Sequence, residues 1–365
     1  MAGMTAMLAI LVSCSKTGGN ITVKAGKITG SPSDPAVELR MKWTPENRYL
    51  MRMELTRRAQ RQQHGQTEMV QQEFSFNQDY ALTVTNAGPE DKRGLNLEIL
   101  SLETSTAVGG NFTLNFDSES QVDTGIENSL SDLLRQSIGG RLHYLLAPNG
   151  KVLKVSGVRE LLQSAARGSN ATASTTLRRV YNPEYFKEIL ELCTLPENPV
   201  KIGERWAFKR EATVGSGTPL LAEGNCTFKG WQDHEKHTCA VIDVDGALRL
   251  RARAPRIVQA TPNQVRFVSL DEAVQSSTNL TNQITRNLAP TVEPGPSIED
   301  GKITGTIWFD PELGLPVESS LEESYSTKVW KVSRQPQTNA PPRSYTSPIT
   351  QKMSFKLVEA GPMGK

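Results

Sequence analysis

The chain has 365 residues, with 41 Lys and Arg against 39 Asp and Glu, and a net charge of +2 at pH 7. This balance gives no electrostatic case for a nucleic-acid partner, because phosphate binding requires a clustered excess of positive charge. About 350 residues would remain after removal of a leader, enough for one large domain or two ordinary ones.

The first predicted element is an export signal. The run from Met4 to Val12 is apolar and too short to span a bilayer. The residues Leu11-Val12-Ser13-Cys14 match the lipobox of bacterial lipoproteins, in which the cysteine thiol receives a diacylglyceryl group. No Lys or Arg precedes the apolar run, and a buried N-terminal strand with a stray cysteine is the alternative. We expect residues 1–13 to be a signal peptide and Cys14 to carry lipid.

The expected location follows from that cysteine. Each buried acyl CH₂ contributes about 0.8 kcal/mol, so two or three chains anchor a protein firmly. Ser15 follows the cysteine in place of the Asp that retains lipoproteins in the inner membrane. We therefore expect a place in the bacterial cell envelope, on an outer membrane and facing the periplasm. Residues 14–35, which are rich in Gly, Ser, Lys and Thr, are expected to form a flexible tether.

Residues 36–158 are predicted to form a first β-rich module. Apolar and polar residues alternate in the stretches 37–43, 49–55, 74–84, 95–99 and 112–116. This alternation is typical of half-buried antiparallel strands with one solvated face. The cluster of Arg57, Arg58 and Arg61 between two such stretches is expected to lie in a solvated loop.

The middle of the chain predicts helices around one hairpin. Thr124 and Glu127 form a capping-box pattern before a helix that Gly139 and Gly140 would end. The hairpin at 140–157 turns at Pro148-Asn149-Gly150. A connector at 159–199 is predicted to be helical, with helices near 158–166 and 183–193. Cys193 lies on the apolar face of the second helix and is expected to be a buried free thiol.

Residues 200–365 are predicted to form a second β-rich module with long surface loops. "IGERWAFKREA" from Ile202 repeats the pattern of "PENRYLMRMEL" from Pro45, and "GTIWFDPELGLPVESS" from Gly305 repeats that of the earlier hairpin. The recurrence in the same order indicates an internal pseudo-duplication, roughly 36–158 and 200–332. The predicted fold class is α+β and mainly antiparallel β, with curved sheets or a half-barrel and a few packed helices.

Two cysteines and two histidines lie close together in the second module. Cys226 and Cys239 flank the polar stretch "GWQDHEKHT", which is typical of a hairpin end, and an exported compartment is oxidising. We therefore expect a Cys226–Cys239 disulfide. His234 and His237 together with Cys239 have ligand types suited to zinc or copper, but they lack a second ligand pair nearby. The sequence accordingly favours neither a metal site nor a cofactor.

No catalytic motif stands out in the sequence. Asp310 and Glu312 in "FDPELG" are explained by turn chemistry, and Asp243 and Asp245 in "VIDVDG" lack the other ligands of a calcium loop. The sequence has no nucleophile elbow and no phosphate-binding glycine loop. No catalytic residue is therefore assigned, and a non-enzymatic role is expected.

Several of these stretches together resemble a known group of proteins. The lipobox, "LPENPVKIGERW" from Leu195, the Pro-Asn-Gly hairpin and "GTIWFDPELGLPVES" look like an uncharacterised bacterial lipoprotein family of the planctomycete and verrucomicrobia type. The resemblance covers most of the chain after Cys14. It implies an envelope protein of unassigned activity and a curved sheet with helices beside it, similar to envelope lipid-carrier half-barrels.

These observations leave three hypotheses for function. The first is non-enzymatic binding of a lipid, another apolar ligand or a peptide in a concavity of the sheet. The second is a structural or assembly role, in which a sheet edge binds another envelope protein. The third is a hydrolase whose site is assembled from residues distant in sequence. The oligomeric state is left open.

Overall fold

The computed structural model describes residues 26–62, 69–86, 93–120, 124–125, 128–147, 150–165, 181, 183–191, 194–212, 220–250, 258–261, 264–267, 297–331 and 343–362. These residues form one antiparallel sheet of thirteen strands, a separate hairpin and three short helices, which confirms the predicted class. The strands of the large sheet are β1 (Asn47–Gln62), β2 (Met69–Asn86), β3 (Arg93–Val108), β4 (Asn111–Asp117), β5 (Thr124–Gly125), β6 (Arg141–Leu146), β7 (Val152–Ser156), β8 (Arg205–Ala212), β9 (Leu220–His234), β10 (His237–Leu250), β13 (Ser297–Asp310), β14 (Leu315–Lys331) and β15 (Arg343–Pro362). The hairpin is β11 (Val258–Thr261) with β12 (Gln264–Phe267), and the helices are α1 (Asn128–Ser137), α2 (Val158–Ala165) and α4 (Pro183–Leu190).

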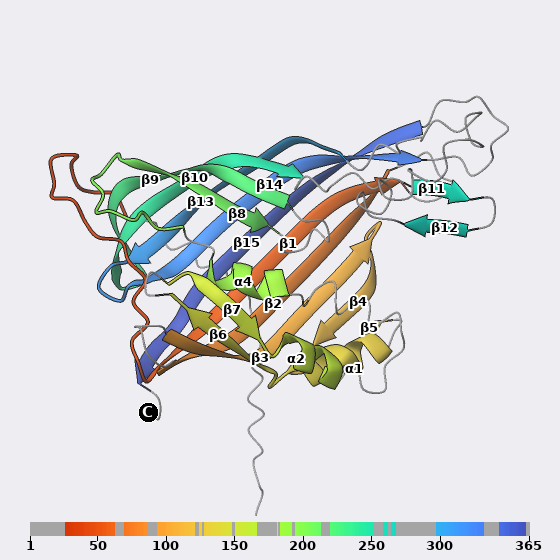
Figure 1. The fold of residues 1–365 in the computed structure, drawn as a ribbon, viewed down its shortest axis with the longest axis horizontal. Coiled ribbons are helices and arrows are strands. Elements are labelled where there is room, and N and C mark those ends of the chain that lie inside the picture. Colours follow the sequence, from red (N-terminus) through yellow and green to blue (C-terminus); the bar gives the residue numbers. More distant parts are fainter. Residues whose placement is uncertain are drawn as a thin grey trace, which may run out of the picture.

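The large sheet is strongly curved and does not close. Its strand order is β5-β4-β3-β2-β1-β15-β14-β13-β10-β9-β8, and β6 and β7 extend from β3 (Figure 1). Arg210 Nη2 on β8 lies 3.5 Å from Glu323 Oε1 on β14, although three strands separate β8 from β14 in the sheet. The sheet therefore bends far enough to bring its β8 edge back over β14, and its concave side becomes an interior.

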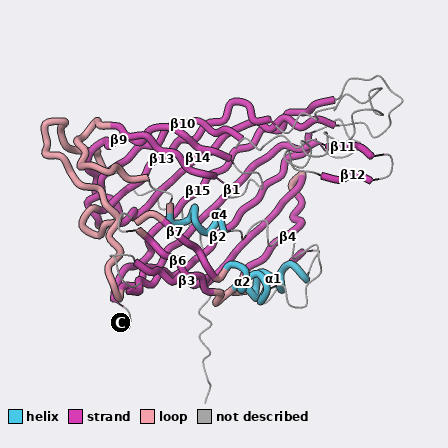
Figure 2. The backbone as a smooth tube through the Cα atoms, viewed as in Figure 1, coloured by secondary structure: helices cyan, strands magenta, loops and turns pink. Residues whose placement is uncertain are grey.

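Alternation along the strands produces this interior. In β14 every second residue from Leu315 to Tyr325 is buried, whereas the residues between them are half-buried or exposed. Successive side chains of a strand point to opposite faces, so one face of each strand lines the concave side. Figure 2 shows long strands crossing most of the molecule, with the helices confined to a small part of it. α4 lies inside the curve, where Tyr185 contacts Met53 of β1 and Gln78 of β2.

The strand pairing of the first module occurs again in the second. β1, β2, β3, β6 and β7 pair in that order, and β8, β9, β10, β13 and β14 pair in the same order, all antiparallel. A residue with positive φ precedes each first strand, Glu46 (φ 64°) and Gly203 (φ 90°). The remaining long strand, β15, pairs with β14 on one side and β1 on the other. β15 therefore joins the two sets into one sheet.

The segment before β1 is held between two hairpin turns. The predicted strand at 37–43 is wrong. Val37 forms an isolated bridge with Val200, and residues 38–43 form no strand. Lys42 N donates to Gly314 O in the β13–β14 turn at 2.8 Å. On the other side, a Cβ on Gly150 of the β6–β7 turn would lie only 2.8 Å from Met41 Cβ. Both glycines have positive φ, which glycine adopts readily.

Two further expectations are corrected or refined. Arg57, Arg58 and Arg61 belong to the long strand β1 and not to a loop: all three are paired with β2, and Arg57 and Arg58 are also paired with β15. Arg58 is exposed and pairs with Glu73 at 3.3 Å, whereas Arg57 is half-buried on the inner face. In the stretch predicted to be a tether, Thr29 exchanges backbone hydrogen bonds with Trp231 of β9 at 2.8 and 2.9 Å.

Some predictions fall on residues outside the described part of the chain. They include the signal peptide, Cys14, Glu127 of the predicted capping box and Cys193. Among the described residues, no helix is both long enough and apolar enough to cross a membrane.

Candidate functional site

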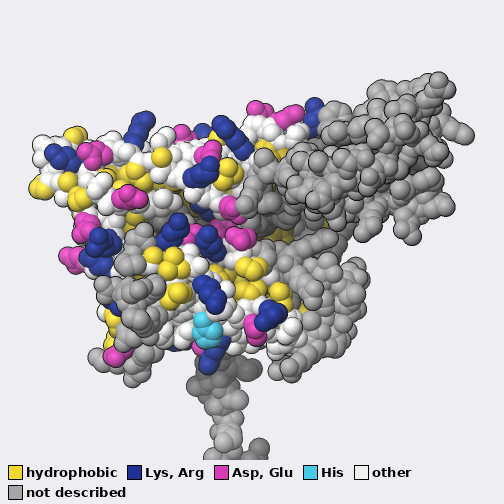
Figure 3. All heavy atoms as spheres, viewed as in Figure 1, with side chains coloured by type: hydrophobic (Ala, Val, Ile, Leu, Met, Phe, Trp, Pro, Cys, Tyr) yellow, Lys and Arg dark blue, Asp and Glu magenta, His cyan; other side chains and the backbone are white. Residues whose placement is uncertain are grey.

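An apolar crevice lies where α4 meets the concave face. Its walls come from four strands, from the helix and from the segment before β1. The lining residues are Met41, Trp43, Met51, Tyr80, Leu82, Ile189, Leu190, Leu315, Pro316 and Phe355. The crevice is narrow, with a cavity volume of about 30 Å³. On the face drawn in Figure 3, hydrophobic side chains lie open between charged ones, including the region where α4 lies in Figure 1.

Trp43 contributes a polar atom to this apolar lining. The side chain is 8% exposed, and its ring lies edge-on to Tyr49 with 5.6 Å between ring centroids. Among the described residues, no acceptor lies within hydrogen-bond distance of the buried indole Nε1. A buried donor without a partner costs about 1–3 kcal/mol. The indole N–H of this lining residue is therefore left without a hydrogen-bond partner among the described residues.

α4 is fastened by polar contacts on its other sides. Tyr185 Oη donates to Gln78 Oε1 at 2.8 Å, and Tyr144 Oη on β6 donates to Phe186 O at 3.1 Å. The backbone N–H of Val152 on β7 donates to the carboxylate of Glu191 just after the helix, at 3.0 Å. Toward the crevice the helix presents only Ile189 and Leu190. The crevice is thus the weakly held side of α4.

The crevice lining carries no formal charge. Its only ionisable side chain is Tyr80, and burial raises the pKa of Tyr80 well above its ordinary value. The phenol therefore stays neutral at physiological pH. An apolar chain would meet side-chain carbon and sulfur over most of this surface, and Met41 and Met51 are flexible enough to adjust to its shape.

A buried ion network lies deeper under the same helix. Arg210 Nη1 on β8 donates to Glu188 Oε1 on α4 at 2.9 Å, and Arg210 Nη2 faces Glu323 Oε1 on β14 at 3.5 Å. Gln351 Nε2 on β15 donates to the other oxygen of Glu323 at 3.3 Å. Arg57 lies opposite Gln351 in the next strand, so the row continues to β1. The network connects α4 with β8 at one edge of the sheet and with β14, β15 and β1 in the middle of the sheet.

The charge state of this network depends on Glu323. Burial raises the pKa of Glu323 to about 7, and the negative charge of Glu188 adds to the rise. The positive charges of Arg210 and Arg57 oppose it. A carboxyl group with so high a pKa is a candidate catalytic acid on general grounds. Here its surroundings are the packed side chains of α4, β8 and β15, so a structural role accounts for it.

A second hollow, of about 390 Å³, has a very different lining. Five of its eleven lining residues are acidic, namely Glu54, Asp79, Glu103, Asp117 and Glu119, and all but one of the others are polar or basic. Arg52 makes a two-pronged contact to the Asp79 carboxylate at 2.7 and 2.9 Å, and this hydrogen bonding lowers the pKa of Asp79. The hollow suits solvent and cations and does not suit an apolar chain.

The predicted Cys226–Cys239 disulfide is wrong. The β9–β10 hairpin turns at Glu235 and Lys236, so Cys226 lies opposite Val244 and Cys239 lies opposite Gln232. Both cysteines are free and buried. Burial raises the pKa of each thiol to about 12, and a neutral thiol is a poor nucleophile.

The two histidines beside that turn lie opposite each other across the hairpin, but they have different carboxylate partners. His237 Nδ1 lies 2.7 Å from Asp310 Oδ2, whereas His234 Nε2 lies 2.9 Å from Glu318 Oε2 on β14. The residues His234, His237 and Cys239, which the sequence does not favour as a metal site, are not grouped as ligands, since Cys239 lies opposite Gln232 in the hairpin. The other oxygen of Asp310 accepts the backbone N–H groups of Glu312 and Leu313, which confirms the predicted turn role of Asp310.

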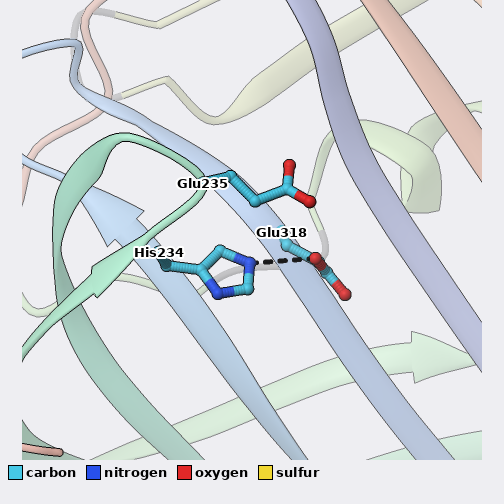
Figure 4. Close-up of side chains that lie close together, drawn as sticks. All are labelled: His234, Glu235 and Glu318. Carbon is cyan, nitrogen blue, oxygen red and sulfur yellow. Dashed lines mark hydrogen bonds and ion pairs between the residues drawn. The ribbon is translucent and has the colours of Figure 1, made fainter. Parts of the chain in front are cut away.

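His234 instead belongs to a cluster with Glu235 and Glu318 (Figure 4). One ligand atom from each lies within 4.8 Å of the other two, and all three side chains are half-buried. Hydrogen bonding to His234 lowers the pKa of Glu318, and the charge of Lys356 lowers it further. Lys356 Nζ also pairs with Glu235 Oε1.

Sequence reasoning missed the crevice residues and Glu318. The aromatic and methionine residues of the crevice were predicted as alternating strand residues, and nothing in their spacing distinguishes a lining side chain from a core one. A signal did exist for Trp43, because the hairpins around Gly150 and Gly314 were recognised as repeats. The segment that contains Trp43 lies between these two turns.

Comparison with known proteins supplies a family but no activity. The model of the "Family of unknown function (DUF6263)" matches residues 92–284. No curated protein matches the sequence. Among solved structures, one described as "Lipid-protein interactions in lipovitellin" is similar with a TM-score of 0.45 and 9% identity over 89% of this chain, which spans 26% of the lipovitellin chain. OccK5 (OpdH) of Pseudomonas aeruginosa gives a TM-score of 0.18 and 7% identity over 87% of this chain and 98% of its own.

Proposed function

This chain belongs to the family of unknown function DUF6263, and on that premise we propose that it is a lipid-anchored envelope protein that binds an amphiphile in the α4 crevice. The proposed ligand has one apolar chain and an oxygen acceptor at its head. The unpaired Nε1–H of Trp43 carries the proposal, because a buried donor in an apolar wall gains a partner when such a head enters.

The apolar chain would supply most of the affinity. Each CH₂ removed from water contributes about 0.8 kcal/mol, so micromolar binding, which takes about 8 kcal/mol, requires burial of nearly all of a twelve-carbon chain. The crevice is narrow, so chain entry requires the two methionine side chains or α4 to move outward. Toward the crevice, α4 presents only the apolar side chains of Ile189 and Leu190. Moving this side of the helix should therefore cost less free energy than breaking the ion pairs of Arg210.

Dodecanoate and dodecyltrimethylammonium are suitable probes for this proposal. They share a twelve-carbon chain, but only dodecanoate has an acceptor. We expect Trp43→Phe to weaken dodecanoate binding about tenfold, because one hydrogen bond to a charged acceptor is lost. Binding of dodecyltrimethylammonium should be unaffected. Displacement of a fluorescent fatty acid, measured below the micellar concentrations, gives both affinities.

Trp206→Phe is the matched control variant. Trp206 Nε1 already donates to Thr194 O at 2.7 Å, and Trp206 does not line the crevice. This substitution should leave both affinities unchanged. Equal dodecanoate affinity in the wild type and in Trp43→Phe, or no binding of either probe to the wild type, would contradict the proposal.

The anchoring part of the proposal rests on the lipobox and needs its own experiment. In cells that make the full chain, an alkyne-tagged fatty acid should label the wild type, and Cys14→Ser should abolish the label. Cys226→Ser is the control, because that buried thiol lies in β9. Labelling that survives Cys14→Ser would refute anchoring and leave the crevice proposal standing.

A further inference from the structure

We propose that His234, Glu235 and Glu318 form a binding site for a divalent transition-metal ion, of which Zn²⁺ is the representative. The site is separate from the crevice and does not depend on amphiphile binding. The imidazole comes from the end of β9, one carboxylate from the β9–β10 turn and the other from β14 (Figure 4).

The distances suit a small ion. Zinc lies about 2.0–2.2 Å from nitrogen and oxygen ligands, so two ligands of one ion lie about 3–4 Å apart. His234 Nε2 and Glu318 Oε2 already lie 2.9 Å apart. The ligand atom of Glu235 lies within 4.8 Å of both, so a small rotation of this one side chain completes the set. Imidazole with two carboxylates is a donor set that zinc and its neighbours in the first transition row accept.

The imidazole is held in place by residues behind it. The ring of His234 stacks on Trp308 of β13, with 4.6 Å between centroids and 12° between planes. Trp308 Nε1 donates to Gln232 Oε1 at 2.7 Å, and Gln232 Nε2 donates to Gly26 O. The stacking on Trp308, which is itself held by Gln232, keeps the plane of the imidazole ring in place. The carboxylates supply the charge that a divalent ion requires.

Lys356 is the competitor of the ion. Its ammonium group pairs with Glu235 and lowers the pKa of Glu318, so it neutralises the same two carboxylates that the metal would use. Without metal, the cluster is therefore satisfied by the pairs Lys356–Glu235 and His234–Glu318. A metal ion must displace the Lys356 ammonium group from Glu235. Removal of the positive charge of Lys356 should therefore strengthen metal binding. A bound ion would cross-link the hairpin end to β14 and leave coordination positions open to water.

The proposal is tested by titrating the full chain, with any tag removed, with Co²⁺ and recording the visible absorption of the bound ion. Addition of Zn²⁺ then measures zinc affinity by displacement of Co²⁺. We expect one ion per chain and no thiolate charge-transfer band. His234→Ala should weaken binding more than about 100-fold, since loss of a mere outer partner of a ligand costs about 10- to 100-fold. Lys356→Met should strengthen metal binding about fivefold, because the ion no longer has to displace a partly exposed ion pair. Zn²⁺ should also raise the Tm of the wild type and not that of His234→Ala.

His237→Ala is the matched control, because His237 lies on the same turn but contacts Asp310. It should leave Co²⁺ binding unchanged. The melting temperature of each variant in chelator reports whether it is folded. Co²⁺ spectra that survive His234→Ala, binding lost in His237→Ala, or weaker binding in a folded Lys356→Met would each overturn the proposal.

Discussion

Arg210→Met should lower the free energy of unfolding by about 3–5 kcal/mol, because removal of one member of a buried ion network leaves charge without compensation. Arg210 is the only described cation within ion-pair distance of the carboxylates of both Glu188 and Glu323. Without it, two buried carboxyl groups face each other across α4 and β14. Urea denaturation at pH 7.5, monitored by tryptophan fluorescence, measures the change.

Arg205→Met is the control for this substitution, since Arg205 lies on the same strand but is exposed. Its effect should be within about 0.5 kcal/mol, as for most surface substitutions. Adding Glu323→Gln to Arg210→Met should recover part of the loss, because the Glu323 carboxylate, which has lost its pairing with Arg210, is then gone. A loss below about 1 kcal/mol in Arg210→Met would show that the network does not join α4 to the sheet as the contacts indicate.

Glu323 should make the protein less stable as the pH rises from about 4.5 to about 7. The pKa of Glu323 is raised from 4.5 to about 7 by burial, so the folded state holds this proton in a range where the unfolded state has released it. Stability then falls by about 1.4 kcal/mol per pH unit across that interval, or about 3 kcal/mol in all, and is level above it. Glu323→Gln should remove this part of the pH dependence and make the protein more stable than the wild type at pH 8.

Glu322→Gln is the control for the pH measurement. Glu322 is the neighbour of Glu323 in β14, but it is exposed on the other face and pairs with Lys352 at 3.3 Å. This variant should keep the pH profile of the wild type between pH 5 and pH 8. A wild type and a Glu323→Gln variant with parallel profiles would show that Glu323 is ionised in the folded protein and hydrated.

The strands could be predicted from the sequence because successive side chains of a strand point to opposite faces, so that apolar and polar residues alternate along it. The stretches from Tyr49 and from Phe74 became the inner faces of β1 and β2, and the two repeated hairpins became β6–β7 and β13–β14. The curvature was not readable, because it depends on which strands pair. The contact between Arg210 and Glu323 spans three intervening strands and leaves no local trace in the sequence.

The predicted disulfide failed for a related reason. A hairpin was correctly placed around His234, but the pairing of its two arms depends on which residues occupy the turn. Glu235 and Lys236 both have positive φ, as in a two-residue hairpin turn, although neither is the Asn or Gly that usually marks one. Without that mark the register could not be counted from the turn. The contact between His234 and Glu318 was missed as well, because the two residues lie on β9 and β14, with β10 and β13 between them in the sheet.

The indole N–H signal of Trp43 is the most direct probe of amphiphile binding in the α4 crevice. The chain has five tryptophans, so ¹H–¹⁵N spectra contain few indole N–H signals, and Trp43→Phe identifies the one that matters. On titration with dodecanoate, we expect a saturable downfield shift of the Trp43 signal, which dodecyltrimethylammonium does not produce. If the Trp43 signal stays in place while dodecanoate binds, the indole N–H does not receive the head of the ligand and the proposed binding mode is wrong.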